Sequence, residues 1–232
     1  MSSNVAIIFG AGAKVGTHVT QKFLQNGYKV VTVSRSDNLS LSDATGESYF
    51  HFKGDLADTK VVPSVFAKTK EVFGEPNVVV YNAAAVSRTT PNGEEFLKLT
   101  VEEVEADQSV NVTSALLAIQ EAVKSFKTLP NEKSKAFIYT GNIQYSQPFP
   151  FISSLGLGKA GAYSALTVAN EYFSKDGYKF YFADERTVEG GPAVTGVSGE
   201  AAADFYFDLA ENENKDIPVL ATFVKGKGYV KF

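Results

Sequence analysis

The sequence contains no cysteine and only two histidines, His18 and His51, among its 232 residues. Without cysteine there is no disulfide, no thiolate nucleophile and no cysteine-based metal site. Two histidines are too few for a histidine-rich metal site. We therefore expect neither a metal centre nor covalent catalysis by a thiol.

Long apolar runs and clusters of basic residues are also missing. No apolar run approaches the ~20 residues that a membrane span requires. The formal net charge is −4 and no Lys/Arg run stands out, so we expect no nucleic-acid partner. Residues 1–4 lead directly into a strand-like run, which predicts no signal peptide and a cytoplasmic location.

Short apolar runs alternate with helical patterns along the whole chain. The patterns predict strands at residues 5–9, 29–33, 49–52, 78–81, 136–139, 180–183 and 220–224. They predict helices at residues 15–26, 61–73, 101–126 with a break near Asn111, 155–174 and 199–211. This alternation is typical of a parallel sheet covered on both faces. We predict one doubly wound, three-layer α/β domain of the Rossmann type over residues 1–232.

A glycine-rich loop directly follows the first predicted strand and opens a helix. In this context Gly10 permits a tight turn, Gly12 lets the backbone approach a phosphate, and Gly16 allows close packing of helix and strand. The helix that begins at Val15, directly after Lys14, then offers N–H groups to a pyrophosphate. The loop predicts a dinucleotide site, the alternative being a glycine-rich turn without a ligand.

The end of the second strand indicates which dinucleotide is bound. NAD sites usually place an acidic residue there to hold the ribose hydroxyls, whereas this chain has Ser34 followed by Arg35. A small hydroxyl and a guanidinium suit a 2′-phosphate, and Lys14 adds positive charge. We expect NADP(H) rather than NAD. Two alternatives stay open: Arg35 and Lys14 are merely solvated, or Asp37 takes the acidic role.

Further motifs, in the same order along the chain, resemble those of the short-chain dehydrogenase/reductase family. The pair Asp55-Leu56 resembles the family's Asp-hydrophobic pair, whose Asp holds the adenine amino group. The pair Asn82-Ala83, after the fourth strand, resembles the family's Asn-Asn-Ala-Gly segment. The resemblance implies that these residues border the cofactor, although Asp55 could also be only a turn former.

Two more residues resemble the family's catalytic machinery. Asn111 resembles the Asn at a helix kink that holds a water in the proton relay, and Lys159 resembles the active-site Lys that binds the nicotinamide ribose. The family's Tyr, four residues before this Lys, and its Ser, thirteen before that Tyr, are here Leu155 and Asn142. Leu155 cannot donate a proton, whereas Asn142 can still hydrogen-bond a carbonyl.

After the sixth strand the family usually has Pro-Gly, where this chain has Asp184, Glu185 and Arg186. Ligands of parallel sheets bind at this carboxyl edge, so we interpret the three as a charged functional cluster, with a solvated loop as the alternative. Tyr145, Asp184, Glu185 or water could replace the missing acid, and we rank Tyr145 and Glu185 as the candidates. A carboxyl group would need a raised pKa for this task.

These residues predict an NADP(H)-dependent oxidoreductase with a non-standard active site. It would transfer hydride to a small carbonyl, an activated alkene or an imine, with polarisation from Asn142. The first alternative is a catalytically inactive NADP-binding sensor or interaction protein, because Leu155 replaces the acid. The second is a lyase or isomerase that uses the acidic pair as a base.

The segments 87–98 and 190–200 are expected to line the pocket of a small-molecule substrate. The polar loops 36–46 and 87–98 are expected to be mobile. The family resemblance implies a homodimer or homotetramer packed through the helices at residues 111–127 and 155–174. The C-terminal residues 227–232 either reach a neighbouring subunit or close the sheet.

Overall fold

The computed structural model of this chain describes residues 3–36, 47–88, 97–211 and 216–232. Within them, eight strands form one sheet of order β3-β2-β1-β4-β5-β6-β7-β8, parallel except for the last strand. The strands are β1 (Val5–Phe9), β2 (Lys29–Ser34), β3 (Tyr49–Lys53), β4 (Val78–Tyr81), β5 (Lys135–Thr140), β6 (Tyr178–Arg186), β7 (Leu220–Val224) and β8 (Gly228–Tyr229).

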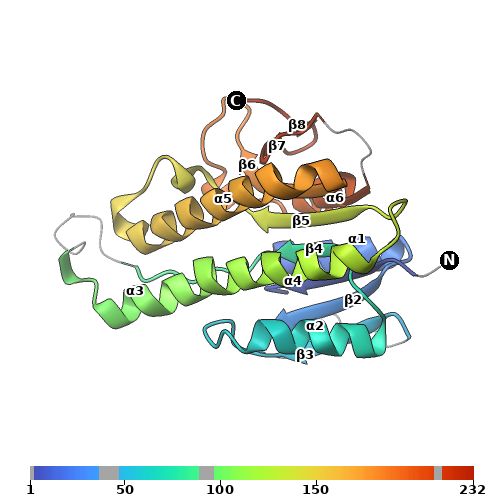
Figure 1. The fold of residues 1–232 in the computed structure, drawn as a ribbon. Coiled ribbons are helices and arrows are strands. Elements are labelled where there is room, and N and C mark those ends of the chain that lie inside the picture. The colour runs from blue at the N-terminus through green and yellow to red at the C-terminus, as the bar shows by residue number, and fades with distance from the viewer. Residues whose placement is uncertain (1–2, 37–46, 89–96, 212–215) are drawn as a thin grey trace.

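Helices cover both faces of this sheet, giving three layers (Figure 1). α2, α4 and α5 pack on one face, and α1 and α6 pack on the other. The α-helices are α1 (Val15–Gln25), α2 (Val61–Val72), α3 (Val101–Gln108), α4 (Ser114–Thr128), α5 (Ser153–Phe173) and α6 (Gly199–Glu211). The shorter helical segments are the π-helix η3 (Ser109–Thr113) and the 3-10 helices η4 (Ile143–Tyr145), η5 (Pro150–Ile152), η6 (Ser174–Asp176) and η7 (Val194–Gly196).

The sheet is buried on both faces, which is why its strands read as continuous apolar runs. All five residues of β1 and all four of β4 are buried. β1 pairs with β2 on one side and with β4 on the other. The strand order therefore reverses at β1, and the carboxyl ends of β1 and β4 mark the switch point where doubly wound sheets bind ligands.

The predicted doubly wound α/β fold is confirmed, and one strand boundary is corrected. The sixth strand continues to Arg186, whereas we predicted that it ends at Ala183. The break predicted near Asn111 is a π-helical segment that joins α3 to α4. The C-terminal tail closes the sheet, because β8 pairs antiparallel with β7. Most of the two loops expected to be mobile, residues 37–46 and 89–96, lies outside the described residues.

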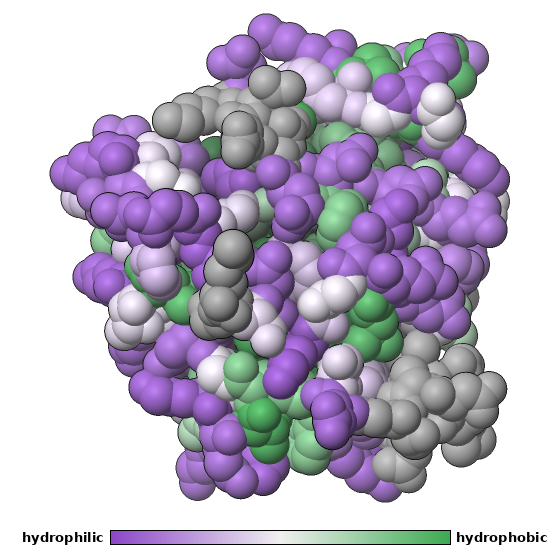
Figure 2. Space-filling model, turned by 90° about the vertical axis from the view of Figure 1, so that its right-hand side faces the viewer, coloured by the Kyte–Doolittle hydropathy of each residue, from purple (hydrophilic) through white to green (hydrophobic). Residues whose placement is uncertain are grey.

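The ends of the sheet present different surfaces. Figure 2 looks at the end that carries the N-terminus and shows mostly hydrophilic side chains, with apolar ones in small separate patches. No helix in the described part of the chain has the length and apolarity needed to cross a bilayer. The carboxyl ends of the parallel strands lie at the opposite end of the molecule, and the candidate site is found there.

Candidate active site at the carboxyl edge of the sheet

The glycine loop after β1 has two glycines at which a side chain would clash with the backbone and one at which it would not. Gly10 has a φ of +85°, and a Cβ there would lie 2.4 Å from the backbone N of Ala83. A Cβ on Gly16 would lie 2.4 Å from the carbonyl oxygen of Gly10. A Cβ on Gly12, in contrast, would meet no atom within 4 Å. The geometry therefore leaves room for a ligand at Gly12, the position expected to approach a phosphate.

The N-terminus of α1 is suited to an anion. The helix follows Lys14, which makes no side-chain capping bond, and its first turn carries no acidic residue. The backbone N–H groups of a first helical turn have no partner within the helix, and the helix dipole adds positive potential there. Together with the open position at Gly12, this end of α1 fits the pyrophosphate of a dinucleotide.

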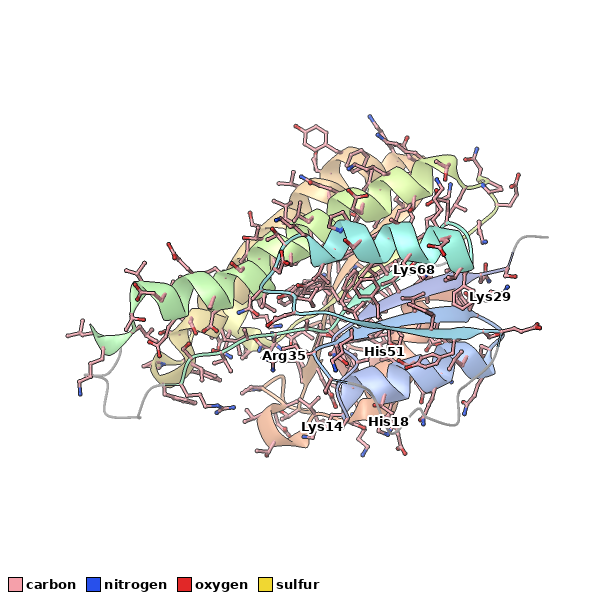
Figure 3. The ribbon with its side chains drawn as sticks, turned by 90° about the horizontal axis from the view of Figure 1, so that it is seen from below. Lys14, His18, Lys29, Arg35, His51 and Lys68 are labelled. Atoms are coloured by element: carbon pink, nitrogen blue, oxygen red, sulfur yellow. The ribbon has the colours of Figure 1, made fainter. Side chains whose placement is uncertain are left out.

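Positive charge lies at the end of β2, as the cofactor prediction requires. Figure 3 shows Arg35 and Lys14 near the middle of the view and Lys29, the first residue of β2, at the opposite end of that strand. Arg35 is exposed, and the Ser34 hydroxyl donates to the carbonyl oxygen of Ser36 at 2.5 Å. Asp37, the acidic alternative, lies outside the described residues.

Asp55 and Leu56 follow the end of β3. Asp55 is exposed, and its Oδ1 accepts a hydrogen bond from the backbone N–H of Ala57. Leu56 is buried, and its carbonyl oxygen accepts from the Ser114 hydroxyl at 2.7 Å. Leu56 thus ties this loop to α4, while Asp55 stands at the surface beside the carboxyl edge.

Asn82 connects the glycine loop to the neighbouring strands and to α6. Its Nδ2 donates to the carbonyl oxygen of Gly10 at 2.8 Å, and its Oδ1 accepts from the Thr140 hydroxyl at 2.9 Å. The Tyr206 hydroxyl donates in turn to Thr140 Oγ1 at 2.9 Å. This chain of bonds holds the ends of β1, β4 and β5 in register, and Ala83 packs directly against Gly10.

Asn111, in the π-helical segment, is fully buried and fastens the loop after β4. Its Oδ1 accepts from the N–H of Ala85 at 2.9 Å, and its Nδ2 donates to the carbonyl oxygen of the same residue at 2.7 Å. Its own carbonyl oxygen accepts from the Tyr139 hydroxyl at 3.1 Å. Gly158 leaves space for it, since a Cβ there would lie 2.4 Å from that of Asn111.

Lys159 is buried on the α5 side of the sheet. Its Nζ donates to the carbonyl oxygen of Thr140 at 2.7 Å and lies 4.6 Å from the centre of the Tyr139 ring. Burial lowers the pKa of Lys159 to about 7, and the charge of Asp184 partly opposes this shift. At neutral pH the amine is therefore poised between its charged and neutral forms.

A cavity of about 430 Å³ opens at this edge of the sheet, a size within the range of about 300–1,000 Å³ typical of small-molecule sites. Its described polar lining comprises Arg88, Thr140, Asn142, Gln144, Glu185 and Tyr206. Its described apolar lining comprises Val15, Gly141, Ile143, Phe149, Phe151, Ile152, Leu155, Ala183, Pro192, Ala193, Val194, Val197, Ala202 and Phe223. The cavity thus joins the start of α1 to the ends of β5 and β6, and both segments expected to line a pocket contribute to it.

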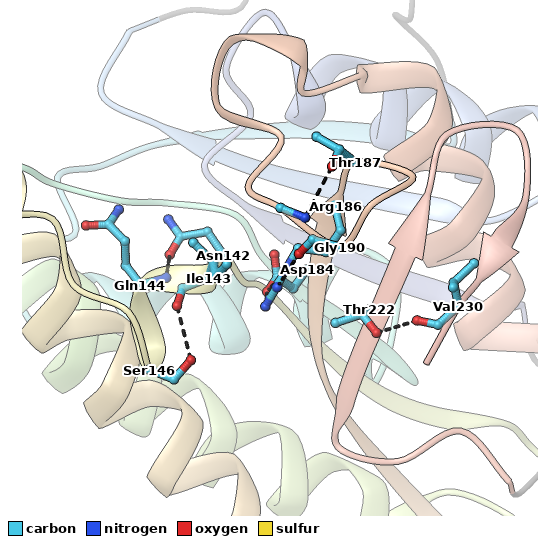
Figure 4. A network of polar contacts seen from close by, with 11 residues as sticks. Asn142, Ile143, Gln144, Ser146, Asp184, Arg186, Thr187, Gly190, Thr222 and Val230 are labelled. Carbon is cyan, nitrogen blue, oxygen red and sulfur yellow. Dashed lines mark hydrogen bonds and ion pairs between the residues drawn. The ribbon is translucent and has the colours of Figure 1, made fainter. Parts of the chain in front are cut away.

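The two residues at the family's Tyr and Ser positions both line this cavity. Asn142 precedes η4, and its Oδ1 accepts from the backbone N–H of Gln144 at 3.1 Å (Figure 4). Within the described part of the chain its Nδ2 has no acceptor, so it can donate to a carbonyl in the cavity. Leu155 presents only methyl groups to the same space.

Tyr145 is placed elsewhere. Its ring packs against Tyr163 and Phe182, with centroids 4.8 and 5.4 Å away. Neither Tyr145 nor Lys159 is among the described residues that line the cavity.

The charged run at the end of β6 is divided between the two faces of the sheet, which corrects our interpretation of it as one cluster after the strand. β6 continues because it pairs with β7 as far as Arg186, and successive side chains of a strand point to opposite faces. Asp184 and Arg186 lie on one face, whereas Glu185 lies on the other and lines the cavity. The alternative of a solvated loop is also wrong, because all three are buried.

Asp184 and Arg186 form a buried ion pair (Figure 4). Asp184 Oδ2 accepts from Nε and Nη2 of Arg186 at 2.7 and 2.6 Å, and Arg186 Nη1 donates to the carbonyl oxygen of Gly190 at 3.0 Å. Burial raises the pKa of Asp184, while Arg186 and then Lys159 act in the opposite direction. The other oxygen of Asp184, Oδ1, has no partner among the described residues.

Glu185 is 9% exposed, and its Oε2 accepts from the backbone N–H of Ser198 at 2.9 Å. Burial raises the pKa of Glu185, and the Ser198 N–H, Lys225 and Lys14 oppose the shift. A carboxyl group that faces a ligand cavity and has a raised pKa can act as a general acid.

Sequence reasoning missed the contribution of Tyr206 to the cavity, whereas Arg88 lies in the segment 87–98 that we expected to line it. Tyr206 lies in the middle of α6, where its apolar neighbours indicate only a core position. No local signal in the sequence marks Tyr206, because only the packing of α6 against α1 brings it to the glycine loop.

Comparisons with known proteins agree with this geometry. Residues 4–176 match the family model of the short chain dehydrogenases. The chain is 41% identical, over 243 aligned positions, to the short chain dehydrogenase/reductase dmxR12 of Cryptosporiopsis sp. (strain 8999), covering 100% of this chain and 96% of that relative.

Two solved structures share the fold at low sequence identity. One is a metagenomic short-chain oxidoreductase in complex with NADP, with a TM-score of 0.81, 17% identity, and 97% of this chain and 98% of that one covered. The other is the 3-ketoacyl-(acyl-carrier-protein) reductase of Brucella melitensis complexed with NADH, with a TM-score of 0.80, 16% identity and the same coverage. With its fold, its glycine loop and the family model that spans most of its length, the chain belongs to the short-chain dehydrogenase/reductase family.

Proposed function

We propose that this protein is an NADP(H)-dependent oxidoreductase that acts on a small carbonyl, an activated alkene or an imine. The observation that carries the proposal is the cavity itself. It joins Val15, at the start of the helix that fits the pyrophosphate, to the donor Asn142 and the carboxyl group of Glu185. Cofactor, polarising group and proton source would therefore share one space.

The residues at the carboxyl ends of β1 to β3 are those that would hold the cofactor. The open backbone at Gly12 and the N-terminus of α1 fit the pyrophosphate. Ser34, Arg35 and Lys14 would hold the 2′-phosphate, and Asp55 would face the adenine. When bound, the cofactor supplies the hydride.

Two side chains that line the cavity would polarise the substrate and donate the proton. Asn142 Nδ2 donates a hydrogen bond to the substrate oxygen or nitrogen and so polarises the double bond. With hydride supplied to the carbon of a carbonyl, the π electrons would pass to the oxygen, and Glu185 would give that oxygen the proton of its carboxyl. Glu185 would then be ionised and would regain its proton from solvent. We assign no proton transfer to Tyr145, and Asn111 and Lys159 act as positioning residues.

Oxidation of NADPH by a panel of carbonyl, enone and imine compounds tests this function. Glu185→Gln should lower kcat by about 10²–10⁴-fold, the usual contribution of a general acid, with a smaller effect on KM. Exposed Glu189→Gln, on the turn after β6, is the matched control and should leave kcat unchanged. Full activity of Glu185→Gln would assign the proton to another group.

Arg35→Ala should weaken NADPH binding by roughly 10–100-fold and leave NADH binding unchanged, because a charge-assisted hydrogen bond contributes about 1.5–3 kcal/mol and only NADPH carries the 2′-phosphate. Titrations of both cofactors by fluorescence measure the effect. Lys68→Ala removes a positive charge from α2, away from the site (Figure 3), and should change neither affinity. Equal losses for both cofactors would contradict the proposed role of Arg35.

One observation favours a catalytically inactive NADP-binding protein as the second candidate. Leu155 lines the cavity where the family has its acid, and Lys159 lies outside the described lining. Tight NADPH binding without turnover of any compound in the panel would support this candidate. A lyase or isomerase loses its main argument, because Asp184 and Glu185 face opposite sides of β6.

We also propose that the protein is a homodimer or homotetramer formed through α4 and α5. Their outer surfaces expose Leu116, Leu157, Val168 and Tyr172, with exposed fractions of 41, 58, 54 and 64%. Exposed apolar side chains gathered on two long helices are typical of an interface.

A further inference from the structure

Glu185 is the only acidic residue among the described residues that line the cavity. Apolar or weakly polar residues line the cavity together with Glu185, among them Ala183 on the same strand and Ala202 and Tyr206 on α6. Arg88 also lines the cavity but is exposed to solvent. A carboxylate in such surroundings interacts with a nearby charge more strongly than a surface carboxylate does, because water screens it less.

The two oxidation states of a nicotinamide ring differ in charge. The oxidised ring carries one formal positive charge and the reduced ring carries none, while the rest of the cofactor is the same in both states. A cofactor whose pyrophosphate lies at α1 would extend its nicotinamide half into the cavity that begins at Val15. A negative charge in that cavity therefore acts on one oxidation state and not on the other.

We propose that Glu185 tunes the oxidation-state preference of the site. Its carboxylate stabilises the cationic NADP⁺, whereas the neutral NADPH gains nothing from that charge and leaves the carboxyl easier to protonate. The inference rests on the proposed function, since it requires the dinucleotide site. It deepens that function, because the carboxyl is easier to protonate beside the neutral ring, when it must donate, than beside the cationic ring.

The other charged or titratable groups around Glu185 are too exposed or too remote to replace it. Lys14 of α1 and Lys225 after β7 are exposed, so their effects on the cavity are screened. His18 packs against Gly199 at the start of α6. Gly199 directly follows Ser198, whose backbone N–H donates to Glu185. Tyr206 stays neutral because burial raises its pKa. Asp184 points to the opposite face of β6, where Arg186 pairs with it.

Titration of NADP⁺ and NADPH at pH 8 into wild type, Glu185→Gln and Glu189→Gln tests the inference without any turnover. The amide oxygen introduced by Glu185→Gln can still accept the bond from the Ser198 N–H, so only the charge is removed. We expect Glu185→Gln to weaken NADP⁺ about tenfold relative to NADPH, the change that corresponds to one partly screened charge pair. Glu189→Gln should leave the ratio of the two dissociation constants unchanged.

A calorimetric measurement on the wild type gives a second readout that needs no variant. When the titrations are repeated across the pH range in which Glu185 titrates, in buffers of different ionisation enthalpy, NADPH binding should take up more protons than NADP⁺ binding. An unchanged ratio in Glu185→Gln, or equal proton uptake for both cofactors, would overturn the inference while leaving the cofactor site intact. Binding of neither cofactor would overturn the proposed function and the inference together.

Discussion

Gly12→Ala should weaken NADPH binding by roughly 10–100-fold and leave the thermal stability of the protein unchanged. The added methyl group meets no protein atom within 4 Å, so nothing in the fold opposes it. It occupies the space through which the backbone N–H groups would approach the pyrophosphate. Losing one charge-assisted hydrogen bond of about 1.5–3 kcal/mol accounts for the expected range.

Gly10→Ala, two residues earlier, provides the contrast. Its Cβ would lie 2.4 Å from the backbone N of Ala83, and its φ of +85° disfavours any side chain. We expect it to lower the free energy of unfolding by about 3 kcal/mol or more. Thermal unfolding and NADPH titration of both variants separate the two effects. Wild-type affinity in Gly12→Ala would show that no phosphate approaches this loop.

Arg186→Met should lower the free energy of unfolding by about 3–5 kcal/mol, the usual cost of leaving one member of a buried ion pair without its partner. The Asp184 side chain is 1% exposed and the Arg186 side chain is 7% exposed. Without Arg186, Asp184 Oδ2 loses both donors and only the charge of Lys159 remains nearby. Denaturant unfolding at pH 8 measures the loss, and Asp184→Asn in the same chain should recover part of it.

The loss in Arg186→Met should depend on pH. Burial already raises the pKa of Asp184 in the folded state, and removal of Arg186 raises it further. A carboxyl group whose pKa is higher in the folded protein than in the unfolded chain binds protons more readily in the folded protein. The free energy of unfolding therefore falls as the pH rises from the unfolded pKa to the folded pKa. The deficit of the variant should therefore be smaller at pH 5 than at pH 8.

The control for this prediction is the exposed pair Lys68–Glu71 on α2. Lys68→Met should cost no more than about 0.5 kcal/mol, as is usual for surface pairs. A loss in Arg186→Met as small as this, or one that does not change between pH 5 and pH 8, would contradict the proposed role of the buried pair.

Most of the fold could be predicted from the sequence because its signals are local. β1 and β4, and the length of α6, agree with the predicted boundaries. Apolar runs, helical periodicity and the glycines after β1 each depend on neighbours within a few residues. Closure of the sheet by β8 was predicted only as one of two alternatives for the tail, because a two-residue strand exists only through its pairing with β7.

The candidate site could be predicted only in part. The open backbone at Gly12 and the positions of Asn142 and Leu155 in the cavity agree with what the motifs indicate. The positions of Lys159 and Tyr145 outside the described lining could not be predicted, because the spacing of a motif does not say which way a side chain turns. Tyr206 could not be found either, since it reaches the site from a helix far along the chain.

The sequence by itself determined a doubly wound α/β fold, a glycine loop directly after its first strand, and the absence of the family's catalytic Tyr. The tertiary structure decided how the charges at the end of β6 are used. Pairing with β7 extends the strand to Arg186, and the alternation of side chains along a strand then turns Glu185 into the cavity and Asp184 away from it. Strand pairing is a non-local interaction, so the contrasting environments of these two adjacent acids arise only when the sheet is assembled.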